Sequence, residues 1–220
     1  MKSRFLVCLD PGHVSDYSQG TRGKRISEAE LAWRYATQLH RLLEQRDFPV
    51  EMTKRSRNEK VSNQHRAEIA NKAGANIFLR LHADARPEPG FAVYYPTRSG
   101  RTKEGVIGPP SEVRSLSRRA AFPFHDAMNS VLKGVFPDFG LFGDEKTLVG
   151  SQQGALTGSI FARVPVLLIE MGSLSNDRDE DFLLSKKGQQ AMLAALVAGV
   201  VAAQQTLTDE QANKKPPQNS

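Results

Sequence analysis

Short apolar runs alternate with amphipathic helical patterns along most of this 220-residue chain. Short apolar runs bounded by turn residues are typical of buried strands, whereas apolar residues three and four apart are typical of helices that pack on a core. We expect strands at residues 4–9, 48–53, 77–81, 91–95 and 164–169, helices at residues 26–46, 59–73, 111–135 and 186–205, and a long surface loop at residues 97–110. This alternation predicts an α/β fold: a single domain with a mostly parallel or mixed twisted sheet and helices on both faces.

The clearest helix covers residues 26–46. Ser27 and Glu30 have the spacing of a capping box, which predicts Ser27 as the N-cap. The apolar stripe of this helix consists of Leu31, Ala32, Tyr35, Ala36, Leu39, Leu42 and Leu43. Further along the chain, Pro123 is expected to interrupt the third helix, and Asn176 is expected to cap a short one.

Length and polarity divide the chain into a domain and a tail. Residues 1–205 are enough for one domain with a full core, whereas the polar residues 206–220 are expected to be a disordered tail. The longest apolar run, residues 191–203, is too short to span a bilayer and is expected to be a buried helix, so no transmembrane segment is predicted. No signal peptide is visible, because the apolar run at residues 5–9 is too short for one. Either the chain acts where it is made, or an export signal lies outside this sequence.

The charge of the chain favours an acidic partner. Its formal net charge is +6 and its pI is about 9.5. Basic residues are densest at residues 98–119, where a solvated loop and helix face explains them as well as a binding surface does. No aromatic residues interleave with these charges, so nucleic acid is not expected as a partner. The single cysteine, Cys8, lies in an apolar run and is expected to be a buried hydrophobic residue.

Three polar residues follow three of the expected strands. His13 follows the first strand after an Asp-Pro-Gly turn, His82 follows residues 77–81, and Glu170 follows residues 164–169. In open α/β sheets, sites form just outside the carboxyl ends of the strands. If these strands are parallel neighbours, the three side chains are expected to meet.

Glu28 is the fourth candidate for this site. It is the first helical residue after the expected N-cap, and it continues the apolar stripe of Ala32 and Leu39. Its carboxylate is therefore expected to point toward the core, where an unpaired charge is costly and a cation must meet it. A favourable acid in the first turn of a helix, or a salt bridge to an arginine, would explain the same position, and the pattern leaves these alternatives open.

Two histidines and a carboxylate form the donor set of a hydrolytic zinc site. Imidazole nitrogen and carboxylate oxygen suit Zn²⁺, and three protein ligands leave a fourth position for water. We expect one zinc ion per chain, held by His13, Glu28 and His82, with Glu170 as the catalytic carboxylate that moves the proton of the water. The remaining histidines end no expected strand and are expected to be surface or packing residues: His40, His65 and His125.

Four segments carry the candidate site residues: LDPGH at 9–13, SEAELAWRYATQLHRLL at 27–43, FLRLHADA at 78–85 and VPVLLIEMGSLSN at 164–176. In order and spacing they resemble the zinc N-acetylmuramoyl-L-alanine amidases of the amidase-3 type, over about residues 5–204. The resemblance implies His13, Glu28 and His82 as zinc ligands and Glu170 as the catalytic residue. It also implies hydrolysis of the amide between the lactyl group of N-acetylmuramic acid and L-alanine in peptidoglycan.

Several positions depart from the pattern of this family. Val14 and Ser15 stand where glycines are usual, and Arg80 stands where the strand usually has a small residue. Asp84 replaces a common asparagine, and Ser173 replaces an aromatic residue. None of these changes removes an expected ligand, but the shape of the groove and the substrate preference do not follow from the resemblance.

The implied substrate is peptidoglycan, and the implied place of action is the cell envelope, in the periplasm or cell wall. Residues 1–205 would then be the zinc amidase domain, and its positive charge would suit electrostatic contact with anionic wall polymers. A zinc peptidase or deacetylase on another amide remains open, because its metal chemistry is the same. A non-catalytic wall-binding module is the contrasting hypothesis, which the presence of all four candidate residues disfavours.

Overall fold

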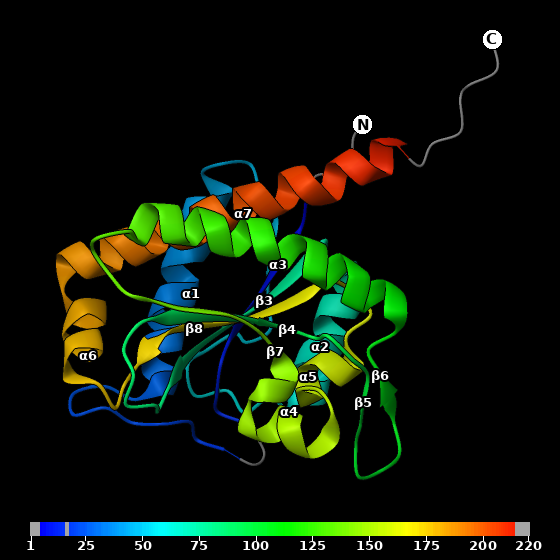
Figure 1. Cartoon of the computed structure of the whole chain (residues 1–220), viewed down its shortest axis with the longest axis horizontal. Helices are drawn as coiled ribbons and strands as arrows, with labels where there is room; N and C mark the ends of the chain where they lie inside the picture. The colour runs from blue at the N-terminus through cyan, green and yellow to red at the C-terminus, as the bar shows by residue number, and fades with distance from the viewer. Residues whose placement is uncertain (1–4, 16–17, 214–220) are drawn as a thin grey trace.

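The computed structural model describes the backbone of residues 5–15 and 18–213 and the side chains of residues 5–15 and 18–208. A six-stranded sheet in the order β2-β1-β3-β8-β4-β7 lies at its centre (Figure 1). The strands are β1 (Val7–Pro11), β2 (Val50–Met52), β3 (Ile77–Asp84), β4 (Phe91–Tyr95), β7 (Asp138–Gly143) and β8 (Val166–Ser173). Neighbours are parallel except β4 and β8, which are antiparallel. The predicted single domain with a mostly parallel, mixed sheet is confirmed.

Helices cover both faces of this sheet (Figure 1). The larger core lies against α1 (Glu28–Glu44), α3 (Ser111–Leu132) and α7 (Lys186–Asn213), and the other face carries α2 (Asn63–Ala73) and α5 (Thr157–Phe161). Strand β3 shows the division: Leu79 and Leu81 belong to the larger core, whereas Phe78 packs with Ala67 of α2 on the opposite face. Helix α6 (Asp177–Leu184) lies at one end of the sheet. Its side-chain cap is Asn176, as predicted.

Helix α1 begins where the sequence predicts. The Ser27 hydroxyl accepts a hydrogen bond from the backbone N of Glu30 at 3.3 Å, so Ser27 is the N-cap. The Glu30 carboxylate does not close the capping box but pairs with Arg34 at 2.5 Å and Arg57 at 3.5 Å. The capping box therefore forms only in part, while the apolar stripe of the helix is buried against the sheet.

Helix α3 runs without a break through Pro123, so the expected interruption is wrong. Proline inside a helix costs about 3 kcal/mol through its missing N–H and its ring. Here the apolar stripe continues on both sides of the proline and packs along α7, which offsets that cost. The stripe consists of Ala120, Ala121, Phe124, Met128 and Leu132.

Helix α7 continues to Asn213, so the expected end of the last helix at residue 205 is wrong. The physical reason is Leu207, which is 6% exposed and belongs to the larger core. Residues 206–213 are helical, and residues 214–220 lie outside the described part of the chain, so the remainder of the expected tail stays a prediction.

Among the described residues, α7 is also the one helix that is long and apolar enough to cross a membrane, over Lys186–Thr208. Its apolar character thus extends beyond the run at residues 191–203. Half of the most apolar window is buried inside the protein, where the helix packs on α3, α1 and α6. This packing agrees with the predicted buried helix.

Two regions contain structure that the sequence patterns did not predict. Between α3 and β8 the chain forms β7, a short 3₁₀ turn η1 (Asp144–Lys146), α4 (Leu148–Gln153) and α5. Gly140 and Gly143 interrupt the apolar pattern that would predict strand β7. Helices α4 and α5 are too short to show a helical period of apolar residues. The expected loop at residues 97–110 contains a small hairpin of β5 (Gly100–Arg101) and β6 (Ile107–Gly108).

Candidate active site

His13 lies just beyond the end of β1, in a turn that packs tightly on β3. The backbone N of Gly12 donates to the carbonyl O of Leu81 at 2.8 Å. A Cβ atom on Gly12 would lie 2.6 Å from the His82 ring, so glycine is required for this close approach. On the other side, Lys54 Nζ donates to the carbonyl O of His13 at 2.7 Å. The turn thus holds the His13 ring beside His82, with ring centroids 5.0 Å apart.

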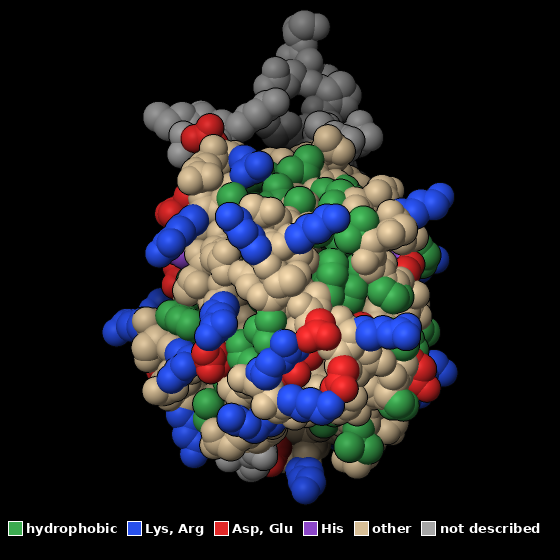
Figure 2. Space-filling model, turned by 90° about the vertical axis from the view of Figure 1, so that its left-hand side faces the viewer, with side chains coloured by type: hydrophobic (Ala, Val, Ile, Leu, Met, Phe, Trp, Pro, Cys, Tyr) green, Lys and Arg blue, Asp and Glu red, His purple; other side chains and the backbone are tan. Residues whose placement is uncertain are grey.

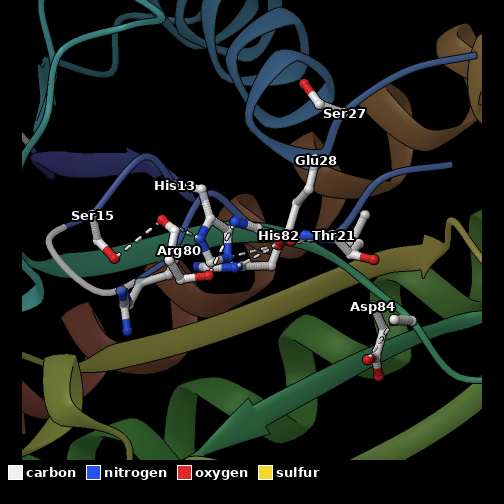
Figure 3. Close-up of polar contacts among 12 residues, drawn as sticks. His13, Ser15, Thr21, Ser27, Glu28, Arg80, His82 and Asp84 are labelled. Atoms are coloured by element: carbon white, nitrogen blue, oxygen red, sulfur yellow. Dashed lines mark hydrogen bonds and ion pairs between the residues drawn. The ribbon is translucent and has the colours of Figure 1, made fainter.

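Glu28 lies between the two histidines (Figure 3). Its Oε1 is 2.8 Å from His82 Nδ1 and 3.3 Å from His13 Nε2, and its Oε2 accepts a hydrogen bond from the backbone N of Thr21 at 2.8 Å. Although burial opposes it, the hydrogen bonds from His13 and His82 lower the pKa of Glu28, so the carboxylate is ionised. Glu28 is 5% exposed, which confirms that it points inward. No arginine among the described residues pairs with it.

The donor atoms of His13, Glu28 and His82 all lie within 4.8 Å of one another. His82 Nε2 is buried and has no hydrogen-bond partner among the residues that the structure describes. Burial lowers the pKa of His82, which favours the neutral ring that binds metals. A Cβ atom on Gly20 would lie 2.8 Å from both Glu28 Oε2 and the His13 ring, so the cluster is closely enclosed. By chemistry and proximity the three donors fit a zinc ion.

His82 and Glu170 lie inside strands rather than after them, because β3 and β8 extend beyond their predicted ends. The two residues are register partners on parallel neighbours, so their side chains share one face of the sheet. Glu170 Oε2 is buried and has no hydrogen-bond partner in the described part of the chain. Burial, followed by the nearby carboxylates of Glu28 and Asp84, raises the pKa of Glu170 well above its usual value.

A buried ionic network supports the turn that carries His13, and the sequence analysis did not predict it. Asp10 accepts from Arg66 Nη1 at 2.5 Å and from Arg80 Nε at 2.9 Å. Arg66 also donates to the carbonyl O atoms of Pro11 and Val14, on either side of His13. Although burial opposes it, Arg66 and Arg80 lower the pKa of Asp10. One sequence feature could have revealed this network: Asp10 is a charged residue in an otherwise apolar strand, and a buried charge of this kind requires partners.

The other titratable residues considered from the sequence lie outside this cluster. His40 and His65 pair with glutamates of their own helices, and His125 pairs with Asp138 at 2.9 Å. Cys8 is fully buried, and burial raises the pKa of its thiol, which confirms the prediction of a buried hydrophobic residue.

Comparison with protein families decides the assignment. Residues 7–202 match the sequence model of one family, Amidase_3, which is described as N-acetylmuramoyl-L-alanine amidase. The chain belongs to this family. The protein is therefore a hydrolase that acts on an amide bond of peptidoglycan, in the cell wall. No protein of curated function is similar enough to the chain to match it.

Solved structures of amidases share the fold of this family member. The apo form of the N-acetylmuramyl-L-alanine amidase Ami1 from Mycobacterium abscessus has a TM-score of 0.75 at 24% identity, over 93% of this chain and 100% of that chain. Ami1 from Mycobacterium smegmatis has a TM-score of 0.75 at 21% identity, over 94% and 100%. An N-acetylmuramoyl-L-alanine amidase from Clostridium difficile 630 has a TM-score of 0.73 at 22% identity, over 92% and 98%.

Proposed function

We propose that the protein is a zinc-dependent amidase that hydrolyses the bond between the lactyl group of N-acetylmuramic acid and L-alanine. His13, Glu28 and His82 are the proposed zinc ligands, for one ion per chain, and Glu170 is the proposed catalytic residue. The observation that carries the proposal is that the donor atoms of the three residues lie within 4.8 Å of one another. Beside them is Glu170, the strand partner of His82, whose Oε2 has no hydrogen-bond partner among the described residues.

The metal, Glu170 and the Asp10 network have different roles in the proposed reaction. When bound, zinc polarises the amide carbonyl and lowers the pKa of the attacking water. Glu170 accepts the proton of that water and passes it to the leaving nitrogen of L-alanine. The raised pKa of Glu170 suits a group that must keep the proton between these two transfers. The Asp10 network holds the His13 turn in place while this happens.

The test is to digest purified peptidoglycan with the zinc-loaded protein and identify the products by mass spectrometry. We expect peptides with a new amino terminus on L-alanine and glycan strands with a free lactyl carboxylate, and we expect chelation to abolish both. Cleavage between amino acids would identify a peptidase, and loss of acetate would identify a deacetylase. Wall binding with no released product would identify a non-catalytic module.

The surface charge favours contact with anionic wall polymers. Figure 2 shows the side of the molecule on which α6 lies in Figure 1, where Lys and Arg side chains are spread over the surface with fewer acidic side chains between them. Salt screens attraction of this kind. Binding to whole walls should therefore weaken as salt rises, whereas cleavage of a small soluble muropeptide should change much less. Equal salt sensitivity in both assays would contradict a docking role for the charge.

A further inference from the structure

A cavity of about 380 Å³ opens beside the proposed zinc ligands. It lies between the loop after β1, the start of α1 and the loop between β2 and α2, whereas Glu170 belongs to β8, on the other side of β3. Six of the residues that line the cavity carry the argument: Val14, Gly20, Thr21, Arg22, Glu30 and Arg57. The cavity and Glu170 thus lie on different sides of His82.

The wall of the cavity is continuous with the proposed metal site. Val14 directly follows His13, and the backbone N of Thr21 donates to Glu28 Oε2 at 2.8 Å. Gly20 lies so close that a Cβ atom there would contact both Glu28 and His13. A group bound in the cavity would therefore be close to the reacting amide and could belong to the same substrate molecule.

Positive charge is in excess among the described residues that line this cavity. The exposed Arg22 guanidinium has no hydrogen-bond or ion-pair partner among the described residues. Arg57 Nη1 is 3.5 Å from Glu30 Oε2, and its Nε donates to Asn58 at 3.2 Å. Glu30 is already paired with Arg34, which does not line the cavity, at 2.5 Å. The charged residues of the described lining are thus the two arginines Arg22 and Arg57 and the one carboxylate of Glu30, whose charge is shared with Arg34. This excess of positive charge favours the binding of an anion.

A carboxylate is the anion that fits this arrangement. Guanidinium groups bind carboxylates through paired, charge-assisted hydrogen bonds. In peptidoglycan whose lactyl groups all carry stem peptides, the N-acetylated glycan strand is uncharged and the free carboxylates belong to the stem peptides. We propose that Arg22 and Arg57 bind a free carboxylate of the stem peptide and make the enzyme prefer acidic stems to amidated ones. This inference rests on the proposed function and names the substrate class of the same site.

The test compares two muramoyl-L-alanyl peptides that differ only in the second residue, which has a free α-carboxylate in one and a primary amide in the other. Charge-assisted hydrogen bonds of this kind predict a preference in kcat/KM for the acid of about tenfold or more. Arg22→Gln and Arg57→Gln should each reduce the kcat/KM of the acid toward that of the amide, and should reduce the kcat/KM of the amide much less. Arg41→Gln is the matched control, because Arg41 is exposed, lies outside the cavity and does not pair with Glu30, so this variant should keep the preference.

Binding of the two product peptides, which begin with L-alanine, is measured in parallel by calorimetry and does not depend on turnover. Tighter binding of the acid, lost in Arg22→Gln or Arg57→Gln, supports the inference. If the wild-type protein hydrolyses and binds acid and amide equally well, the inference is wrong and the proposed function stands. If it hydrolyses neither substrate but still binds the acid more tightly, the proposed function fails and the carboxylate site stands. Equal losses on both substrates in the variants would also contradict a carboxylate-specific role.

Discussion

His82 on β3 and Glu170 on β8 are register partners across two parallel strands. Their side chains leave the sheet on one face, and Glu28 reaches the same place from the first turn of α1. The sheet therefore sets the position of the proposed proton carrier relative to one ligand, and the helix adds the third donor. Loops contribute only His13, and the Asp10 network holds that loop in place.

The ligand assignment predicts how metal content responds to substitution. His13→Ala, Glu28→Ala and His82→Ala should each lose most bound zinc, because each removes one of three donors. Glu30→Ala is the control on the same helix turn, since its carboxylate pairs with Arg34 and Arg57 and is not a proposed ligand. Elemental analysis of the purified variants gives the answer. Loss of zinc in Glu30→Ala with retention in Glu28→Ala would show that the helix face has been assigned incorrectly.

Much of this site could be predicted from sequence because its residues lie in strong patterns. The apolar stripe of α1 placed Glu28 on the inner face, and the strand-like runs before His82 and Glu170 placed both residues at one edge of the sheet. The strands extend past these residues because a site residue within a buried strand interrupts the apolar run without ending the backbone pairing.

The features that sequence did not predict depend on tertiary packing. Helix α3 continues through Pro123, and α7 continues past residue 205, because each buries apolar side chains of the other and of the sheet. The pairing of Asp10 with Arg66 and Arg80 joins residues of β1, α2 and β3, whose contact no local pattern reveals. Strand β7 and the short helices after it have too few periodic residues to be recognised.

The Asp10 network predicts a large and pH-dependent contribution to stability. Asp10→Asn leaves two buried guanidinium groups without their counter-charge and should lower the free energy of unfolding by about 3–5 kcal/mol at pH 7. Because the pKa of Asp10 is lowered in the folded protein, this contribution is complete above the unfolded pKa of about 4 and is lost progressively as the pH falls from there toward the much lower folded pKa. Urea denaturation of both proteins from pH 3 to 8 measures the full contribution and the onset of its loss. Asp181→Asn, at an exposed ion pair, is the control, and a similarly small change in both variants would contradict the role of the network.

Asp144 predicts the opposite pH dependence. Burial, with the Glu145 carboxylate nearby, raises the pKa of Asp144 from 3.8 to about 6, and its Oδ1 has no partner among the described residues. Because this carboxyl ionises near pH 4 in the unfolded chain and only near pH 6 in the folded protein, stability falls as the pH rises from about 4 to about 6. The full loss, as much as about 3 kcal/mol, persists above pH 6. Asp144→Asn should be more stable than the wild type at pH 8 and about equally stable at pH 4, as measured by urea denaturation. A variant that is less stable at both values would show that the ionised carboxylate makes needed hydrogen bonds.

Leu207 tests where the folded domain ends. It is buried beyond residue 205, so Leu207→Ala should lower the free energy of unfolding by about 2–4 kcal/mol. Gln205→Ala, on the exposed side of α7, should change it by less than about 0.5 kcal/mol. Thermal or urea denaturation compares the two. An equally small effect of both substitutions would place the end of the stabilising core before residue 206.

The central claim is that Glu170 moves protons and does not hold the metal. Glu170→Gln keeps the size and shape of the side chain but removes the proton acceptor. The measurement is zinc content and kcat of the same folded Glu170→Gln preparation on a soluble muropeptide. We predict normal zinc content with kcat reduced by about two to four orders of magnitude, the usual range for general acid–base catalysis. A folded variant that has lost its zinc, or one that holds zinc and remains fully active, would contradict the account.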